Sequence, residues 1–393
     1  MTKFVYADNA ATTPILPEVL AAMQPCFETA WGNPSSQHSK GNEAKELLDD
    51  ARDRIAKVFS CKANEIYFTS CGTESDNWAI KGAAMRMKKK GRTHIVTSKI
   101  EHHAVLNTCL ALEKEGFTVS YVGVDEYGVV DLDELKSVVT DNTALVAVMY
   151  ANNEVGTIQP IAEICEIAHS HGALMFTDAV QAVGSVDIDL SKLPVDMLAL
   201  SGHKIHAPKG IGMLFIRRGV LISNLIDGGG QELRKRGGTE NLPYIVGLAK
   251  ALEIAKEKLP GIDKVSEKRD RLIKALTAIP YSRLNGHPTQ RLAGNCNVGF
   301  EFIEGESILL WLDMMGICAS TGSACSSASL EASHVLLAMG VPHDKAHGSV
   351  RLSITHETTD EDIDYIIENL PPIIQRLRDM SPLWEEIARK EGK

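Results

Sequence analysis

Short apolar runs alternate with amphipathic stretches from about residue 45 to residue 220. The runs have the length of β-strands, and they lie at 66–69, 93–97, 118–122, 144–149, 173–177 and 197–200. Helical patterns separate most of these runs, at 74–87, 104–115, 133–139 and 161–171. Strands separated by helices of this length predict a parallel α/β sheet with helices on both faces. The ligand of such a sheet is expected at the carboxyl ends of its strands.

The pattern changes after Gly247. A helical stretch at 248–259 is broken by Pro260 and Gly261, and a longer amphipathic helix is predicted at 262–279. Beyond it the sequence predicts a strand at 297–300, a helix at 307–315 and a Gly/Ser loop. A helix from Ser333, a strand at 349–353 and a last helix at 361–378 follow. We therefore expect a large domain over 15–258 and a smaller α+β domain over 259–393. Residues 1–14 are expected to form an arm that packs with the small domain.

Composition narrows the class of protein. The chain has 393 residues, 44% hydrophobic and 23% charged, which is ordinary for a soluble globular protein of this length. A formal net charge of −10 argues against a nucleic-acid surface and against anchoring to anionic lipid. Neither a membrane-spanning stretch nor a secretory signal is visible, so we expect a cytoplasmic protein. The eight cysteines form no C-x-x-C pair, which favours free and mostly buried thiols over a zinc site.

Lys204 follows the apolar run 197–200 directly, in the string Ser201-Gly202-His203-Lys204. An ε-amine held in a desolvated pocket loses its charge and becomes a nucleophile toward carbonyls. Asp178 ends the preceding apolar run. A lysine and an acid at the ends of neighbouring strands fit a pyridoxal phosphate (PLP) site, in which the lysine forms a Schiff base and the acid keeps the pyridine nitrogen protonated. Both could instead be rim residues, and Lys204 alone does not separate the two interpretations.

A candidate phosphate site follows the strand at 66–69. Gly72 allows the backbone to approach an anion closely, and the helix that begins there offers free N–H groups and a favourable dipole. The Thr73 hydroxyl adds a donor. The same residues are also typical of an ordinary helix start. Their combination with Lys204 and Asp178 favours the cofactor site.

Three further segments supply candidates around the ring. Gln181 lies three residues after Asp178, so on a starting helix the two would share a face and the amide could reach a phenolic oxygen. In isolation it would be a polar residue at a helix start. Either His102 or His103 could stack on the ring and relay protons, and their spacing does not separate them. The segment 152–156 is a turn by composition, at the sheet edge where it could reach the substrate.

Together these motifs resemble the cysteine desulfurases of the NifS/IscS group, within the class V aminotransferase-like PLP enzymes. The resemblance is nearly end to end. The matching segments are 6–13, 32–36, 69–77, 152–156, 178–181, 201–204, 236–239 and 320–327. The last segment separates the group from aminotransferases of the same fold. The resemblance implies the type I fold of PLP-dependent transferases, with a mainly parallel seven-stranded sheet between helices.

The resemblance also implies roles for individual residues. Lys204 would carry the Schiff base, Asp178 would pair with the pyridinium nitrogen, and His102 would stack on the ring and relay protons in catalysis. Arg351 would take the substrate carboxylate, for which a guanidinium fork is well suited. Gln181 would contact the phenolic oxygen, and Asn153 would contact both the cofactor and the amino acid. The phosphate would be held by Gly72, Thr73, Ser201 and His203. Thr239 would reach the phosphate from the second subunit of a homodimer.

Cys325 lies in a run, 319–329, composed almost entirely of Gly, Ala, Ser and Thr. Composition alone favours a small residue in a flexible loop. The resemblance instead implies a catalytic thiol that takes sulfur from L-cysteine, becomes a persulfide and passes the sulfur to an acceptor such as an iron–sulfur scaffold protein. It also makes Cys325 a candidate transient ligand of an iron–sulfur cluster.

Three alternatives remain open from the sequence. A class V aminotransferase or lyase acting on another amino acid would need Lys204 but not Cys325. A selenocysteine lyase would differ in substrate preference only. A non-catalytic scaffold that binds iron–sulfur assembly proteins would have no use for a Schiff-base lysine.

Overall fold

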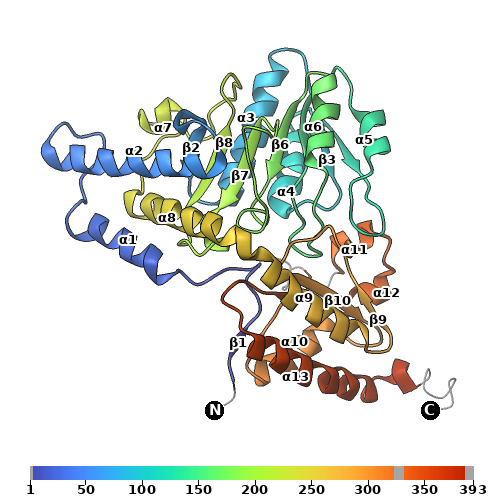
Figure 1. Ribbon diagram of the computed structural model, residues 1–393. Helices are drawn as coiled ribbons and strands as arrows, with labels where there is room; N and C mark the ends of the chain where they lie inside the picture. Colours follow the sequence, from blue (N-terminus) through green and yellow to red (C-terminus); the bar gives the residue numbers. More distant parts are fainter. Residues whose placement is uncertain (1–2, 323–331, 386–393) are drawn as a thin grey trace.

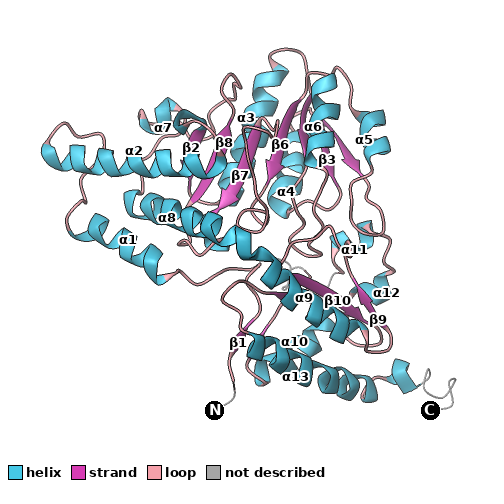
Figure 2. Cartoon of the chain, viewed as in Figure 1, coloured by secondary structure: helices cyan, strands magenta, loops and turns pink. Residues whose placement is uncertain are grey.

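The computed structural model describes residues 3–322 and 332–385. Its central feature is a seven-stranded sheet (Figures 1 and 2). The strand order across this sheet is β2 (Ile66–Thr69), β8 (Gly212–Ile216), β7 (Met197–Ser201), β6 (Leu174–Asp178), β5 (Thr143–Ala147), β3 (His94–Ser98) and β4 (Thr118–Val122). The strands from β7 to β4 are parallel, whereas β8 is antiparallel to both of its neighbours. The reversal has a simple cause: the connection over 202–211 is too short for a crossover helix.

Helices cover both faces of this sheet, because alternate side chains of each strand point to opposite faces. Ile95 packs in one hydrophobic cluster and its neighbour Val96 in the other. The first face is covered by α3 (Gly72–Lys88) and α4 (His103–Glu113). The second is covered by α1 (Pro17–Glu28), α2 (Ser39–Phe59), α5 (Leu132–Val138), α6 (Ile161–Ser170) and α8 (Leu242–Lys258). The predicted, mainly parallel α/β sheet between helices is therefore confirmed.

A third hydrophobic cluster lies around a small antiparallel sheet of order β12 (Ser349–Ser353), β10 (Asn295–Phe300) and β9 (Ser282–Leu284). It is enclosed by α9 (Ile262–Thr277), α10 (Gly305–Met314) and α13 (Asp360–Asp379). The N-terminal strand β1 (Val5–Tyr6) joins this part of the molecule by pairing with β11 (Ile317–Cys318). Figure 1 shows this blue segment beside the red C-terminal helix. We propose a domain boundary at the 3-10 turn η3 (Leu259–Gly261), which joins α8 to α9.

Two local predictions differ from the structure. Helix α8 begins at Leu242, well before residue 248, and Pro243 in its first turn suits a helix start because its missing N–H has no partner there anyway. Gln181 does not lie on a starting helix. The segment after β6 makes one turn, with Ala182 N–H bonded to the Ala179 carbonyl at 3.0 Å, and Gly184 at φ +83° then directs the chain away. No helix in the described ranges is long and apolar enough to cross a membrane.

Candidate active site

A cavity of about 390 Å³ opens at the carboxyl ends of the central strands, as expected for a sheet of this kind. It gathers residues that are far apart in the sequence. The predicted site residues that line it are Gly72, Thr73, His102, Asn153, Asp178, Gln181, Ser201, His203, Lys204 and Arg351. Thr239 is exposed and does not line it. Cys325 lies outside the described residues.

Lys204 lies in a short 3-10 turn, η2 (Gly202–Lys204), directly after β7. Its Nζ donates to the carbonyl oxygens of Ala10 and Ala11, at 2.6 and 2.8 Å. Gln181 Nε2 also donates to the Ala10 carbonyl, at 3.0 Å. The N-terminal arm therefore crosses the cavity beside the lysine and holds its amine in place. This explains structurally why the segment 6–13 belongs with the site.

The arm is fixed to the small sheet as well. Asn9 Nδ2 donates to the Ser353 carbonyl at 2.8 Å, and the Ala10 N–H donates to Ser353 Oγ at 2.9 Å. On the other side, the Thr13 hydroxyl donates to the His203 carbonyl at 3.0 Å. The arm thus connects β12 to the loop that carries Lys204.

The start of α3 has the features of an anion site. Its N-cap residue, Cys71, makes no side-chain cap, so the first N–H groups of the helix are left for another acceptor. A Cβ on Gly72 would lie 2.9 Å from Val180 Cγ2, which is too close, so only glycine lets the backbone reach this depth. Thr73 and the buried Ser201 add hydroxyl donors on the same cavity wall. These donors fit a phosphate group.

Asp178 is the last residue of β6 and is 6% exposed. One of its oxygens, Oδ1, accepts the Val180 N–H at 2.9 Å. Burial raises the pKa of Asp178, while the nearby charges of His102 and Lys204 act in the opposite direction. A buried carboxyl group on the cavity wall suits a partner that carries a protonated nitrogen.

His102 is the N-cap of α4, and its Nδ1 accepts the Ala104 N–H at 3.1 Å. Because an N–H can only donate, the proton of the neutral ring must be on Nε2. Burial lowers the pKa of His102, with Asp178 opposing the shift. His103 begins α4 and contacts His334 instead, with ring centroids 4.9 Å apart. Both rings line the cavity, but the charges of Asp178 and Lys204 affect the pKa of His102 and not that of His103.

Arg351 comes from β12, on the small sheet, and is 1% exposed. Its Nη2 pairs with Asp8 Oδ1 at 3.1 Å, and its Nη1 donates to the Asn153 carbonyl at 2.9 Å. Nε is buried and has no partner among the described residues. A buried guanidinium with a donor to spare is suited to bind an additional carboxylate.

Sequence analysis did not single out three acids at this site, of which Asp76 and Glu154 are buried and Asp8 is partly buried. Asp8 is the counter-ion of Arg351, although it lies inside the motif at 6–13. Asp76 lines the cavity, and one of its oxygens has no partner within the described ranges. Burial raises its pKa well above the usual range, with the charges of Asp178 and Glu101 adding to the effect. Glu154 accepts from the Ser333 hydroxyl and lies beside Gly322. Their acidity was the available signal, but sequence spacing does not show burial.

Comparison with known proteins agrees with this geometry. The family model described as aminotransferase class V matches residues 5–366. The chain belongs to this family. A protein named cysteine desulfurase IscS from Methanosarcina thermophila is 56% identical, covering 97% of this chain and 94% of that protein. A protein of the same name from Clostridium botulinum is 53% identical with full coverage of both chains. Within the family, the chain therefore groups with the cysteine desulfurases.

Solved structures give the same result. A structure titled NifS-like protein superposes with a TM-score of 0.90 at 40% identity, covering 95% of this chain and 100% of that one. Another, titled SspA in complex with cysteine, has a TM-score of 0.79 at 35% identity, covering 90% of this chain and 100% of that one. The predicted resemblance to the NifS/IscS group and the type I fold are confirmed.

Proposed function

We propose that this chain is a PLP-dependent cysteine desulfurase, which removes sulfur from L-cysteine and yields L-alanine and a persulfide on Cys325. One observation carries the proposal: Lys204 and Asp178 line a single cavity with the uncapped start of α3. An amine, an acid and a phosphate site in one cavity are what this cofactor requires. The names of the relatives and the cysteine complex of one structural neighbour support cysteine as the substrate.

The residues present fit pyridoxal phosphate. Lys204 would hold its aldehyde carbon and Asp178 would keep the ring nitrogen protonated. When bound, the cofactor supplies an electron sink that makes the Cα proton of an amino acid acidic. His102 would lie on the ring. The remaining contacts would be Gln181 to the phenolic oxygen and Gly72, Thr73, Ser201 and His203 to the phosphate.

Arg351 would bind the carboxylate of L-cysteine through its spare donors, and Asn153 would orient the amino acid beside it. The Lys204 amine would be the base that moves the Cα proton. Burial lowers the pKa of His102, which favours the neutral ring, and this ring presents a proton on Nε2. His102 can therefore serve as a proton relay near the substrate sulfur.

Sulfur transfer needs the thiolate of Cys325, because the thiolate is the reactive form of cysteine. Its Sγ attacks the substrate sulfur, so that an S–S bond forms while the Cβ–S bond breaks. The electron pair of the broken bond stays with the carbon fragment, which takes up a proton and leaves as L-alanine. The enzyme sulfur is oxidised and the carbon is reduced, so the step needs no external oxidant.

We propose a cytoplasmic homodimer as the working form. Thr239 is exposed and does not line the cavity of its own chain, so it is available to complete the phosphate site of a partner protomer. The persulfide would pass to an acceptor protein such as an iron–sulfur scaffold, with Cys325 as a transient ligand of the cluster. The formal charge of −10 supports neither nucleic acid nor membrane as a partner.

The decisive experiment compares Cys325→Ala with the parent enzyme. The variant should still bind the cofactor and still show a spectral change with L-cysteine, but sulfide and alanine should no longer accumulate catalytically. Cys318→Ala is the matched control, because Cys318 lies on β11, near Cys325 in the sequence, and does not line the cavity. A plain lyase breaks the carbon–sulfur bond without an enzyme thiol. Near-parental sulfide release by Cys325→Ala would therefore replace the desulfurase mechanism by the lyase one.

A further inference from the structure

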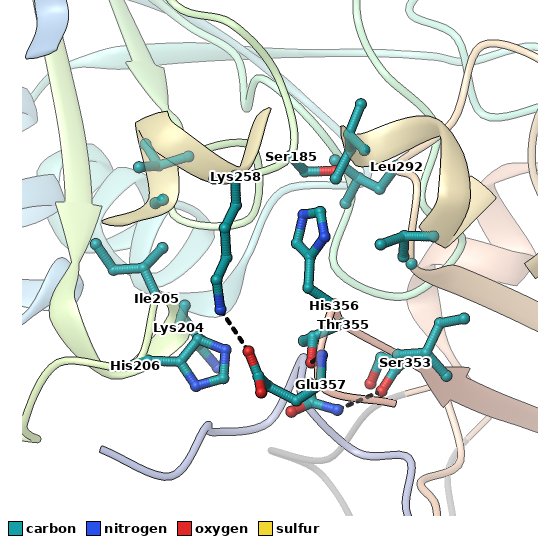
Figure 3. A pocket seen from close by; sticks show the side chains of 18 of the residues that line it. Ser185, Lys204, Ile205, His206, Lys258, Leu292, Ser353, Thr355, His356 and Glu357 are labelled. Carbon is teal, nitrogen blue, oxygen red and sulfur yellow. Dashed lines mark hydrogen bonds and ion pairs between the residues drawn. The ribbon is translucent and has the colours of Figure 1, made fainter. Parts of the chain in front are cut away.

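A second cavity, of about 130 Å³, lies behind the active site at the junction of the two proposed domains (Figure 3). The large domain contributes the end of α8 and the segments at 183–185 and 204–206. The small domain contributes the start of α9, the segment 292–295 and the chain just after β12. Three residues, Ala10, Gln181 and Lys204, line both this cavity and the active site. The two spaces are therefore neighbours, with these three residues between them.

The walls of the cavity are mainly apolar. Ile254 and Leu292 belong to the hydrophobic cluster of the large domain, whereas Val265 and Ile354 belong to that of the small domain. The cavity therefore lies where two separately formed cores meet without filling the space between them. An enclosed apolar cavity of about 150 Å³ is known to accept benzene. The present cavity is slightly smaller and is partly open to solvent, because the Lys258 and Glu357 side chains on its wall are 38% and 53% exposed. The space is large enough for one six-membered ring.

Two imidazole rings give this cavity a polar side. His206 Nδ1 donates to the Pro14 carbonyl at 3.0 Å, so Nε2 of the neutral ring is an acceptor. His356 Nε2 is buried and has no partner within the described ranges. Burial lowers the pKa of both rings, and the charge of Lys258 adds to the effect, which favours the neutral forms. In Figure 3 both rings lie around the same space, with Lys258 and Glu357 beside them.

The charged side chains that line the cavity are Lys204, Lys258 and Glu357, and each already has a partner. Lys204 donates to the carbonyls of Ala10 and Ala11. Lys258 at the end of α8 forms an ion pair with Glu357 after β12, across the domain junction. An anionic ligand would have to compete with Glu357 for Lys258 and would face neutral imidazoles, so its desolvation would not be offset. A hydroxyl group suits the rings better, because it can donate to an imidazole nitrogen or accept from one. The chemistry of the walls therefore selects an apolar ring that carries a hydroxyl.

We propose that this cavity is an effector site for a small, neutral, hydroxylated molecule of about the size of phenol. Its ring would fill the space between Ile254, Val265 and Ile354, and its hydroxyl would bond to His356. The bound molecule would contact Ala10, Gln181 and Lys204, the residues that line both cavities, and would act on the active site through them. The prediction of ligand binding depends only on the geometry and chemistry of the cavity. The effector role rests in addition on the proposed function.

Calorimetric titration of the cofactor-loaded enzyme with phenol tests the binding. Phenol should bind saturably, and benzoate should not bind. His356→Phe should weaken phenol by about 2- to 12-fold, the equivalent of one neutral hydrogen bond, and leave benzene unchanged. His356→Gln should keep most of the phenol affinity, because its amide can still pair with a hydroxyl. Ala255→Leu, which adds carbon atoms from α8 into the cavity, should abolish binding of both rings.

Several results would overturn the proposal. A phenol titration that does not saturate would show that the space holds only water. Phenol binding that survives Ala255→Leu would place the ligand elsewhere. Benzoate binding more tightly than phenol would contradict the selection of a neutral ligand. The effector role is tested separately by the KM for L-cysteine with saturating phenol. This KM should shift in the parent enzyme and stay constant in Ala255→Leu. Saturable phenol binding with an unchanged parent KM would refute the effector role. A failure of the proposed function is distinguishable, because the enzyme would then release no alanine from L-cysteine even without phenol.

Discussion

Arg351→Lys is the substitution that tests the substrate site most directly. Arg351 is 1% exposed, with Nη2 on Asp8, Nη1 on the Asn153 carbonyl and a buried Nε to spare. Lysine keeps the positive charge but cannot present two parallel donors to a carboxylate. A hydrogen bond to a charged group contributes about 1.5–3 kcal/mol, so the loss of one should raise KM for L-cysteine by about 10- to 150-fold.

The effect should appear in KM and not in kcat. The carboxylate does not change during sulfur transfer, so Arg351 binds the ground state and the transition state alike, and such uniform binding affects KM alone. Initial rates of alanine formation over a range of L-cysteine concentrations give both constants. Cysteamine, which lacks the carboxylate, serves as a competitive inhibitor, and its inhibition constant should be the same in variant and parent.

Arg283→Lys is the matched control, because Arg283 is a partly buried arginine on β9 of the same small sheet and does not line the cavity. An unchanged KM in Arg351→Lys would show that the substrate carboxylate binds elsewhere. An equal loss of affinity for cysteine and cysteamine would show that Arg351 acts only as a structural partner of Asp8 and Asn153. Either result would refute the reasoning from the spare guanidinium donor.

Four further experiments have defined outcomes. Lys204→Ala should abolish turnover, and borohydride reduction of the parent followed by peptide mapping should place the pyridoxyl group on Lys204; label on another lysine would exclude this assignment. Asp178→Asn should retain cofactor but lose about 10- to 150-fold in kcat, since a charge-assisted hydrogen bond to the ring nitrogen is lost; near-normal turnover would make Asp178 structural. Burial raises the pKa of Glu101 to about 8. Between the usual carboxyl range and pH 8, the folded state therefore binds more protons than the unfolded state. The free energy of unfolding should fall as the pH rises through this window. Glu101→Gln should flatten the melting-temperature profile between pH 5.5 and 8, and a parental slope would contradict this origin. Mixing Lys204→Ala with Thr239→Val protomers should rebuild one complete site per hybrid dimer, whereas an active monomer at working dilution would exclude shared sites.

The sequence alone determined the α/β class and the position of Lys204 and Asp178 at strand ends. Period and run length decide this, because a buried parallel strand must be apolar on both faces and its polar residues come where it ends. The motif at 320–327 indicated the resemblance to the cysteine desulfurases within this fold. Helix-breaking residues were informative as well, because Pro260 and Gly261 interrupt a helix through their own backbone geometry.

Only the tertiary structure decided which residues meet. The carbonyls of Ala10 and Ala11 hold Lys204 across nearly two hundred residues of sequence, and Asp8 pairs with Arg351 from the opposite end of the chain. His102 caps α4, and the charge of Asp178 affects its pKa, whereas the His103 ring contacts His334. Such contacts depend on how two cores are placed against each other. No local pattern encodes that placement, because the free energy that fixes it comes from burial summed over the whole chain.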